Sequence, residues 1–227
     1  LELVNGEIFN WINSDDYLAV EALGVIGSSF GKADILAGKC RHFWEGTNKE
    51  EILSTVNLDY RKIIYQPSWV KKFNFLRCRY QQPGVWLKPS LVKQCGGLDL
   101  ELHYRFDHEL MYRYLILFDQ VKYIDYLLAN FRLHEGSKTV NSMSQTQLFQ
   151  KEKIKAVHKL MNWQKFSAAH YYCQLYLREQ NWLEIVSQIR KDDQSSKWKK
   201  RIKILSLIFH DPKIRLSRLS LGAIRRI

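Results

Sequence analysis

The sequence predicts an α/β fold followed by an α-helical C-terminal extension. Apolar stretches with strand character alternate with helical patterns over residues 1–140, as a sheet covered by helices requires. Residues 141–227 show mainly helical patterns. With 227 residues, of which 46% are hydrophobic, the chain can form one substantial domain and an appendage.

The first half begins with a predicted strand over 8–12, which runs directly into Asp15 and Asp16. The elements expected after it are a helix over 17–30, a strand over 34–38, a polar stretch without assignment over 39–60, a mixed segment over 69–79, a short helix over 91–95, a helix over 107–118 and a strand over 121–131. Gly96 and Gly97 stop the short helix. The second half is expected to contain a linker over 141–147 and helices over 151–161, 168–179 and 182–190.

The positive charge of the chain is concentrated at its C-terminal end. The net charge is +12, and residues 190–227 contain twelve Lys and Arg against three Asp, so they carry +9 of it. Within 197–227, four apolar residues fall on one helical face, namely Trp198, Ile202, Leu205 and Phe209. This pattern predicts either a basic amphipathic helix on an anionic membrane surface or a helix docked on the domain with a solvated basic face. Nucleic acid is not an expected partner, because no helix-turn-helix, RNP or zinc pattern is present.

Cysteine spacing and hydropathy favour a cytoplasmic protein. The four cysteines, Cys40, Cys78, Cys95 and Cys173, match neither a disulfide framework nor a zinc motif. No apolar run approaches the roughly 18 residues that a membrane span needs. We therefore expect a cytoplasmic location, with membrane association, if any, on the cytoplasmic face.

Two adjacent carboxylates at the end of the first predicted strand indicate a ligand site. Side chains at the carboxyl end of a strand in an open α/β sheet lie where such sheets bind ligands. Asp15 and Asp16 supply hard oxygen donors, which suit Mg²⁺ or Mn²⁺ bridging a diphosphate. The alternative is that Asp16 caps the helix expected after it.

Later motifs follow in a specific order. They are Gln82-Pro83, Gly96-Gly97-Leu98-Asp99, Asp107 at a helix start, and Arg132-x-His134-x-x-Ser137-x-Thr139. Together with Asn13-Ser14-Asp15-Asp16, this order resembles the second half of a family-two glycosyltransferase with the GT-A fold, a Rossmann-like sheet. The resemblance covers residues 1–140, so that 1–140 is expected to be the C-terminal part of a catalytic domain and 141–227 a basic helical extension.

The resemblance implies an enzyme of polysaccharide biosynthesis, hexosyltransferase-like, that moves a sugar with inversion from a nucleotide-diphospho-sugar to a glycan or lipid-linked acceptor. It implies a Mg²⁺ or Mn²⁺ ion held by Asp15 and His134, with Asp107 as the general base that deprotonates the acceptor. The alternative for Asp107 is an ordinary helix N-cap.

The remaining site residues also follow from the resemblance. Arg132 is expected beside the diphosphate, and Gln82 and Trp86 on the acceptor-side loop, although Trp86 could equally fill the core. Asn13 occupies the first position of the family's Asp-x-Asp motif and is assigned to substrate binding. Asp16 is then a supporting ligand, a ribose contact or the helix cap.

The chain departs from the family pattern at its start. The strand, the Pro-Thr-Tyr-Asn type loop and the acidic base-binding residue that precede the aspartate motif in the family are absent from the sequence. We therefore expect a fragment without its nucleotide-binding half, which does not turn over a nucleotide sugar alone. The alternative is a non-catalytic fragment that acts as a binding module through its basic helical tail.

Overall fold

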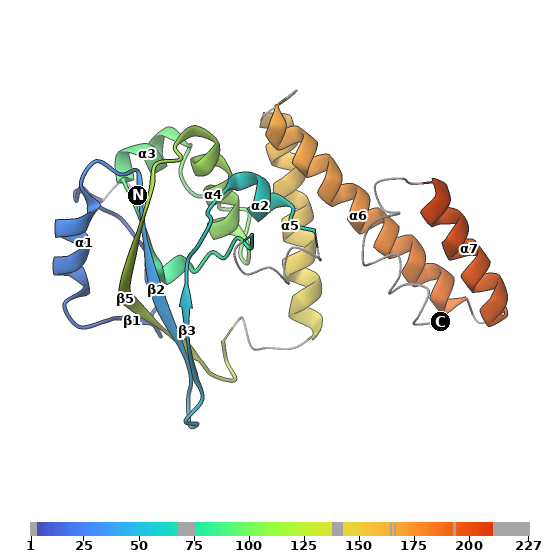
Figure 1. Cartoon of the computed structure of the whole chain (residues 1–227), viewed down its shortest axis with the longest axis horizontal. Helices are drawn as coiled ribbons and strands as arrows, with labels where there is room; N and C mark the ends of the chain where they lie inside the picture. The colour runs from blue at the N-terminus through green and yellow to red at the C-terminus, as the bar shows by residue number, and fades with distance from the viewer. Residues whose placement is uncertain are drawn as a thin grey trace.

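The computed structural model describes residues 4–67, 76–137, 143–163, 165, 167–192 and 194–210 (Figure 1). Most of the mixed segment expected over 69–79, the expected boundary between residues 140 and 141, and the tail beyond residue 210 lie outside these ranges.

A mixed five-stranded sheet forms the centre of the first half. Its strands are β1 (Tyr17–Leu18), β2 (Ile35–Trp44), β3 (Glu50–Ser54), β4 (Val85–Leu87) and β5 (Val121–Leu133). The order is β1-β5-β2-β3, and β4 pairs with the first residues of β2. The central pair, β2 and β5, is parallel, whereas the other pairs are antiparallel. The carboxyl ends of β2 and β5 therefore meet at one edge of the sheet.

Helices cover both faces of this sheet, and three long helices account for most of the described residues of the second half (Figure 1). They are α1 (Ala22–Phe30), α2 (Tyr60–Ile64), the 3₁₀ turn η2 (Gln82–Gly84), α3 (Pro89–Gln94), α4 (Phe106–Leu117), α5 (Met143–Trp163), α6 (Ala168–Lys191) and α7 (Lys197–His210). In Figure 1, α1 lies on one side of the sheet, and α3 and α4 lie on the other. The α/β prediction is confirmed.

Side-chain alternation along the strands decides which helix each residue contacts. Successive strand residues point to opposite faces. Leu36, Trp86 and Leu128 pack against α1. Their strand neighbours Ile35 and Leu87 pack on the other face, in a cluster with the buried residues of α4. Each fully buried aliphatic side chain contributes about 1.5–3 kcal/mol, so this two-sided core fixes the position of α4 against the sheet.

The expected strand over 8–12 is not a strand. Phe9 makes a single antiparallel bridge to Leu87, with N···O distances of 2.7 and 2.8 Å. After Phe9, a side-chain hydrogen bond takes the place of backbone strand pairing: Asn10 Nδ2 donates to the carbonyl of Pro83 at 3.0 Å. Phe9 and Trp11 pack against the core.

The expected helix over 17–30 begins five residues late. Tyr17 and Leu18 pair with β5, and Glu21 adopts a left-handed φ of 60° immediately before α1. The polar stretch over 39–60, which the sequence left without assignment, contains more strand than expected. β2 continues to Trp44, and the chain returns as β3 through a turn at Gly46 with φ of 71°.

The helical half contains longer helices than the sequence predicted. The end of the expected linker, residues 143–147, belongs to α5, and the two helices expected over 168–190 form one continuous helix, α6. No Gly or Pro interrupts that segment, so nothing in it stops the helix.

The helical half packs on the α/β half through a shared apolar cluster. Buried residues of α2, α4, α5 and α6 form this cluster, including Ile64, Tyr112, Leu160 and Cys173. Among the described helices, none is long and apolar enough to cross a membrane.

Candidate functional site

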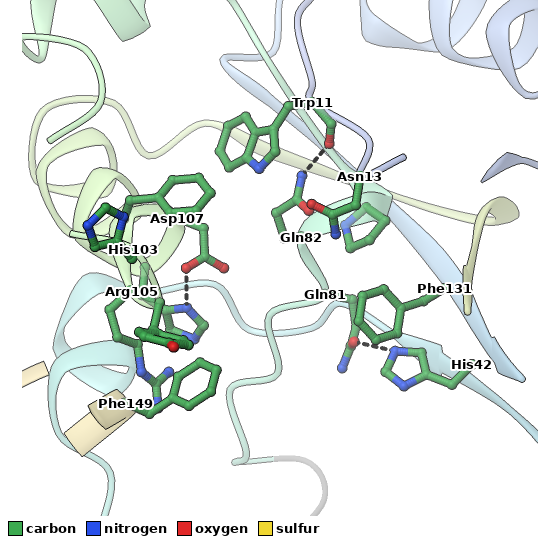
Figure 2. A pocket seen from close by; sticks show the side chains of 14 residues that line it. Trp11, Asn13, His42, Gln81, Gln82, His103, Arg105, Asp107, Phe131 and Phe149 are labelled. Atoms are coloured by element: carbon green, nitrogen blue, oxygen red, sulfur yellow. Dashed lines mark hydrogen bonds and ion pairs between the residues drawn. The ribbon is translucent and has the colours of Figure 1, made fainter. Parts of the chain in front are cut away.

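A cavity of about 490 Å³ lies where the carboxyl ends of β2 and β5 approach the start of α4 (Figure 2). His42 and Phe131 line it from these strands, Gln82 from η2, and Asp107 from α4. Trp11, Tyr104, Phe106 and Phe149 add aromatic rings to its wall. Aromatic rings beside polar groups are the usual lining of a small-molecule site.

Asp107 lies at the start of α4, as predicted, and its carboxylate points into this cavity (Figure 2). The side chain is 20% exposed, and His108 Nδ1 lies 3.0 Å from its Oδ1. Burial alone would raise the pKa of Asp107, but the charge of His108 and its hydrogen bonds outweigh burial and lower the pKa below its ordinary value of 3.8. The carboxylate is therefore ionised and able to accept a proton.

A carboxylate from the helical half holds the loop that precedes Asp107. Glu152 on α5 accepts backbone hydrogen bonds from His103 at 3.0 Å, Tyr104 at 2.6 Å and Arg105 at 3.0 Å. Phe149, one turn earlier on α5, lines the cavity itself. The extension expected to be an appendage thus completes the site. The sequence carries no signal for this, because about 50 residues separate Glu152 from the loop.

For the sugar transfer that the family resemblance implies, we expect Glu152→Ala to lower kcat/KM by about 10²-fold. A small displacement of catalytic groups by a distant substitution can cost that much. The three amides lose their acceptor, so the start of α4 and Asp107 shift. Steady-state kinetics well below the melting temperature measure this effect. Glu184→Ala, an exposed glutamate on α6, is the matched control and keeps full activity. Equal rates for both variants would show that the loop needs no anchor.

Asp15 and His134, the two predicted metal ligands, lie together although 119 residues separate them. The distance from His134 Nε2 to Asp15 Oδ2 is 3.0 Å. No group of three or more His, Cys, Asp or Glu side chains suited to a metal is found among the described residues. Mg²⁺ is commonly held by one or two carboxylates together with substrate phosphates, and of this pair Asp15 supplies one such carboxylate.

Asp16 has a structural role that the sequence did not identify. Its Oδ1 accepts the backbone N–H of Arg132 at 3.0 Å, and its Oδ2 accepts Asn13 Nδ2 at 2.9 Å. Burial raises the pKa of Asp16 above 3.8, and these hydrogen bonds oppose that rise. The helix-cap alternative is wrong, because α1 begins only at Ala22. Asp16 and Asn13 instead fasten the Asp15 loop to β5.

A neighbouring cavity of about 390 Å³ contains Asp15 and Arg132. The Arg132 guanidinium pairs with Glu45, which lines the same cavity. Asn13, two residues before Asp15, lines the cavity of Asp107. Asp15 and Asp107 therefore line two different cavities.

The two residues assigned to the acceptor-side loop differ in their surroundings. Gln82 lines the Asp107 cavity, and its Nε2 donates to Asn10 Oδ1 at 2.8 Å and to the Trp11 carbonyl at 2.7 Å. Trp86 is only 7% exposed and packs in the core beneath α1. The assignment of Trp86 to the acceptor-side loop is thus wrong, and the alternative of core packing holds. Trp86 is next to Leu87 in β4, so its side chain points to the opposite face of the sheet.

His42 is a cavity residue that the sequence did not single out. Its Nε2 lies 2.8 Å from Gln81 Oε1, and its ring centroid lies 4.9 Å from that of Phe131 (Figure 2). Burial lowers the pKa of His42 below its usual 6.5, although the hydrogen bond that His42 donates to Gln81 Oε1 opposes this. Only the extension of β2 beyond the predicted strand brings this residue to the cavity.

The Gly96-Gly97 motif acts through α4 rather than at the cavity. Gly97 N–H donates to the Val92 carbonyl at 3.0 Å and ends α3, with φ of 72° at Gly97. The Gly97 carbonyl accepts Arg113 Nη2 at 2.8 Å, and Arg113 pairs with the buried Glu109 one turn back on α4. The motif therefore fixes the helix that carries Asp107.

Comparison with known proteins gives a structural match without a sequence match. No protein-family model matches the sequence, and no curated protein matches it. The crystal structure of S. aureus TarS 1-349 in complex with UDP-GlcNAc is similar at a TM-score of 0.52 and 17% identity, over 78% of this chain and 49% of that chain. TarS 1-349 without ligand and with UDP gives TM-scores of 0.48 and 0.46, at 14% and 13% identity, over 78% of this chain and 47% of those chains. The chain thus spans about half the length of these structures. At this level of identity the likeness concerns the fold: the described chain shares the α/β architecture of TarS 1-349.

Proposed function

We propose that this chain carries the diphosphate and acceptor side of a glycosyltransferase. The enzyme moves a sugar from a nucleotide-diphospho-sugar donor to a glycan or lipid-linked acceptor with inversion, as in polysaccharide biosynthesis. The observation that carries the proposal is the ionised Asp107 carboxylate, which points into an aromatic-lined cavity beside the Asp15–His134 pair. The fold shared with TarS, whose crystal structure contains UDP-GlcNAc, supports a nucleotide-sugar donor.

The chemistry follows from the positions of these groups. The acceptor hydroxyl oxygen forms a bond to the anomeric carbon while the bond from that carbon to the diphosphate oxygen breaks. Asp107 accepts the hydroxyl proton, and the nucleoside diphosphate leaves with the bonding electrons. Attack from the face opposite the leaving group inverts the anomeric centre. The rings of Trp11, Tyr104 and Phe149 provide apolar faces for sugar rings in the same cavity.

The leaving group is charged, and two features of the chain suit it. A Mg²⁺ or Mn²⁺ ion held by Asp15 and His134 would neutralise charge on the diphosphate. Arg132 lies in the same cavity as Asp15, and its guanidinium can donate two parallel hydrogen bonds to a phosphate. The ion pair between Arg132 and Glu45 would then have to break.

We propose that the enzyme works in the cytoplasm, since all four cysteines are free thiols, of which three are buried. The binding-module alternative concerns a different part of the molecule. In Figure 1, α7 lies on α6, away from the sheet and from α4, so surface binding through α7 and sugar transfer at Asp107 can occur in one protein.

The test is sugar transfer by the protein from its complete reading frame. Uridine and guanosine diphosphate sugars are supplied with Mn²⁺ and with oligosaccharide or lipid-linked acceptors, and nucleoside diphosphate release and the anomer of the product are measured. Acceptor-dependent release with an inverted anomer supports the proposal. A retained anomer excludes the single displacement. If the protein shows no release and no calorimetric binding of any nucleoside diphosphate, the proposal as a whole is excluded.

A further inference from the structure

The last described helix, α7, has one face on the protein and one face in solvent. Ile204 is fully buried and Ile208 is 7% exposed, and both pack against Trp182 and Val186 of α6. This contact fixes the rotation of α7 about its own axis. The prediction of a docked helix is therefore correct for α7, but the docked residues are Ile204 and Ile208. The four apolar residues that the sequence placed on one helical face do not belong to this contact.

These four apolar residues, called the strip below, lie on the exposed side of α7. Trp198 is 69% exposed, Phe209 63%, Ile202 49% and Leu205 38%. These residues are four, three and four positions apart, so they form one continuous strip along the helix. Isolated apolar side chains are ordinary on a protein surface, but a continuous strip of large ones marks a contact site.

The strip is bordered by positive charge on both sides. Residues 197–210 contain five Lys and Arg and no Asp or Glu. On a helix of 3.6 residues per turn, Lys199 and Lys203 fall beside the strip on one side and Arg201 on the other. Lys203 lies 3.6 Å from Asp192, a long contact at an exposed position, so it remains available to an anionic surface.

The apolar strip and its basic borders together indicate what the exposed face of α7 binds. An anionic bilayer presents negative headgroups and, beneath them, an apolar layer, which matches a strip of Trp, Ile, Leu and Phe between rows of Lys and Arg. Trp198 stands near one end of the strip, and tryptophan favours the level of the headgroups. A nucleic acid would engage the charges but would leave the strip in water. We infer that α7 lies flat on an anionic membrane surface and inserts this strip between the headgroups.

Membrane contact by α7 does not depend on the proposed enzyme activity. The residues of α7 are remote in the chain from Asp107, and none of them lines either cavity of the candidate site. Variants of α7 therefore test the membrane contact alone. Transfer to a water-soluble acceptor stays at the wild-type rate in each of them, and loss of that transfer would concern the proposed function instead.

The experiment is sedimentation of the full protein with vesicles of phosphatidylcholine, with and without 30% phosphatidylserine. We expect binding to the anionic vesicles that weakens with salt and no binding to neutral ones. Each basic residue near such a surface contributes about 1 kcal/mol, so Lys199→Gln with Arg201→Gln lowers partitioning by about 30-fold. Lys32→Gln with Lys93→Gln removes the same charge from exposed positions of the α/β half and has little effect.

A second pair of variants tests the apolar strip. Trp198→Ser with Phe209→Ser removes its two most exposed members and abolishes sedimentation, whereas Val20→Ser with Leu100→Ser, at residues that are 85% and 87% exposed, does not. Sedimentation equilibrium without lipid measures self-association in parallel. Equal vesicle binding by all four variants, no binding to anionic vesicles at low salt, or an α7-dependent dimer in the absence of lipid would each overturn the inference.

Discussion

Replacing Asp107 with asparagine is expected to lower the rate of sugar transfer by about 10²- to 10⁴-fold, the usual cost of losing a general base. Asparagine keeps the shape of the side chain at the start of α4 but cannot accept the proton of the acceptor hydroxyl. Donor affinity should change little, because Asp15 and Arg132 lie in the neighbouring cavity. Initial rates of nucleoside diphosphate release, together with calorimetric titration of the donor, separate these two quantities.

Asp119→Asn, just beyond the other end of α4, serves as the control because it removes an exposed carboxylate near the same helix. It should retain wild-type turnover. A rate for Asp107→Asn equal to that of this control would show that the Asp107 carboxylate only stabilises the helix start, which was the alternative that the sequence left open.

The pH dependence of kcat/KM should reflect the environment of Asp107. The base must be ionised, so activity is lost as pH falls through its pKa, and because that pKa lies below 3.8 the acid limb should lie below about pH 4. Arg105, His108, Tyr80 and Tyr112 are the ionisable groups near it. His108→Gln removes the main opposing charge, leaves burial uncompensated and should move the limb to higher pH. An acid limb unchanged in this variant would contradict the proposed role of His108.

Replacing Asp15 with alanine is expected to remove most of the metal-dependent activity. A divalent cation contributes several kcal/mol of charge stabilisation, so we expect a decrease of about 10²-fold or more in kcat. Since Asp15 and His134 form one pair, His134→Ala should have a similar effect, and the double variant should be little worse than either single variant.

A second measurement for Asp15 does not depend on turnover. Titration of the protein with Mn²⁺ in the presence of uridine diphosphate, followed by electron paramagnetic resonance, reports cation binding directly. Asp15→Ala should weaken it, whereas Glu135→Ala, an exposed carboxylate beside His134, should not. Unchanged Mn²⁺ binding in Asp15→Ala, or full wild-type activity in excess chelator, would exclude the assignment.

The sequence was sufficient where local pattern and motif order carry the information. The periodicity of residues 107–118 located α4 and placed Asp107 at its start, and the structure has this helix over 106–117. The resemblance carried by the order of the motifs assigned Asp15 and His134 to one site, and the structure brings these residues together although they are 119 positions apart in the sequence. The sequence also showed that Trp198, Ile202, Leu205 and Phe209 share a helical face, because spacing alone fixes which residues of a helix lie together.

What the sequence could not decide is which face meets which neighbour, since that depends on contacts between distant segments. Strand periodicity allows Trp86 to point either way, and only the packing of α1 on the sheet buries it. The anchoring of the Asp107 loop by Glu152 arises when α5 docks beside α4. The solvent-facing side of α7 is likewise set by the burial of Ile204 and Ile208 on α6. Side-chain periodicity is a property of the local backbone, but burial is a property of the assembled fold, and the roles of Trp86, Glu152 and the α7 strip follow from burial.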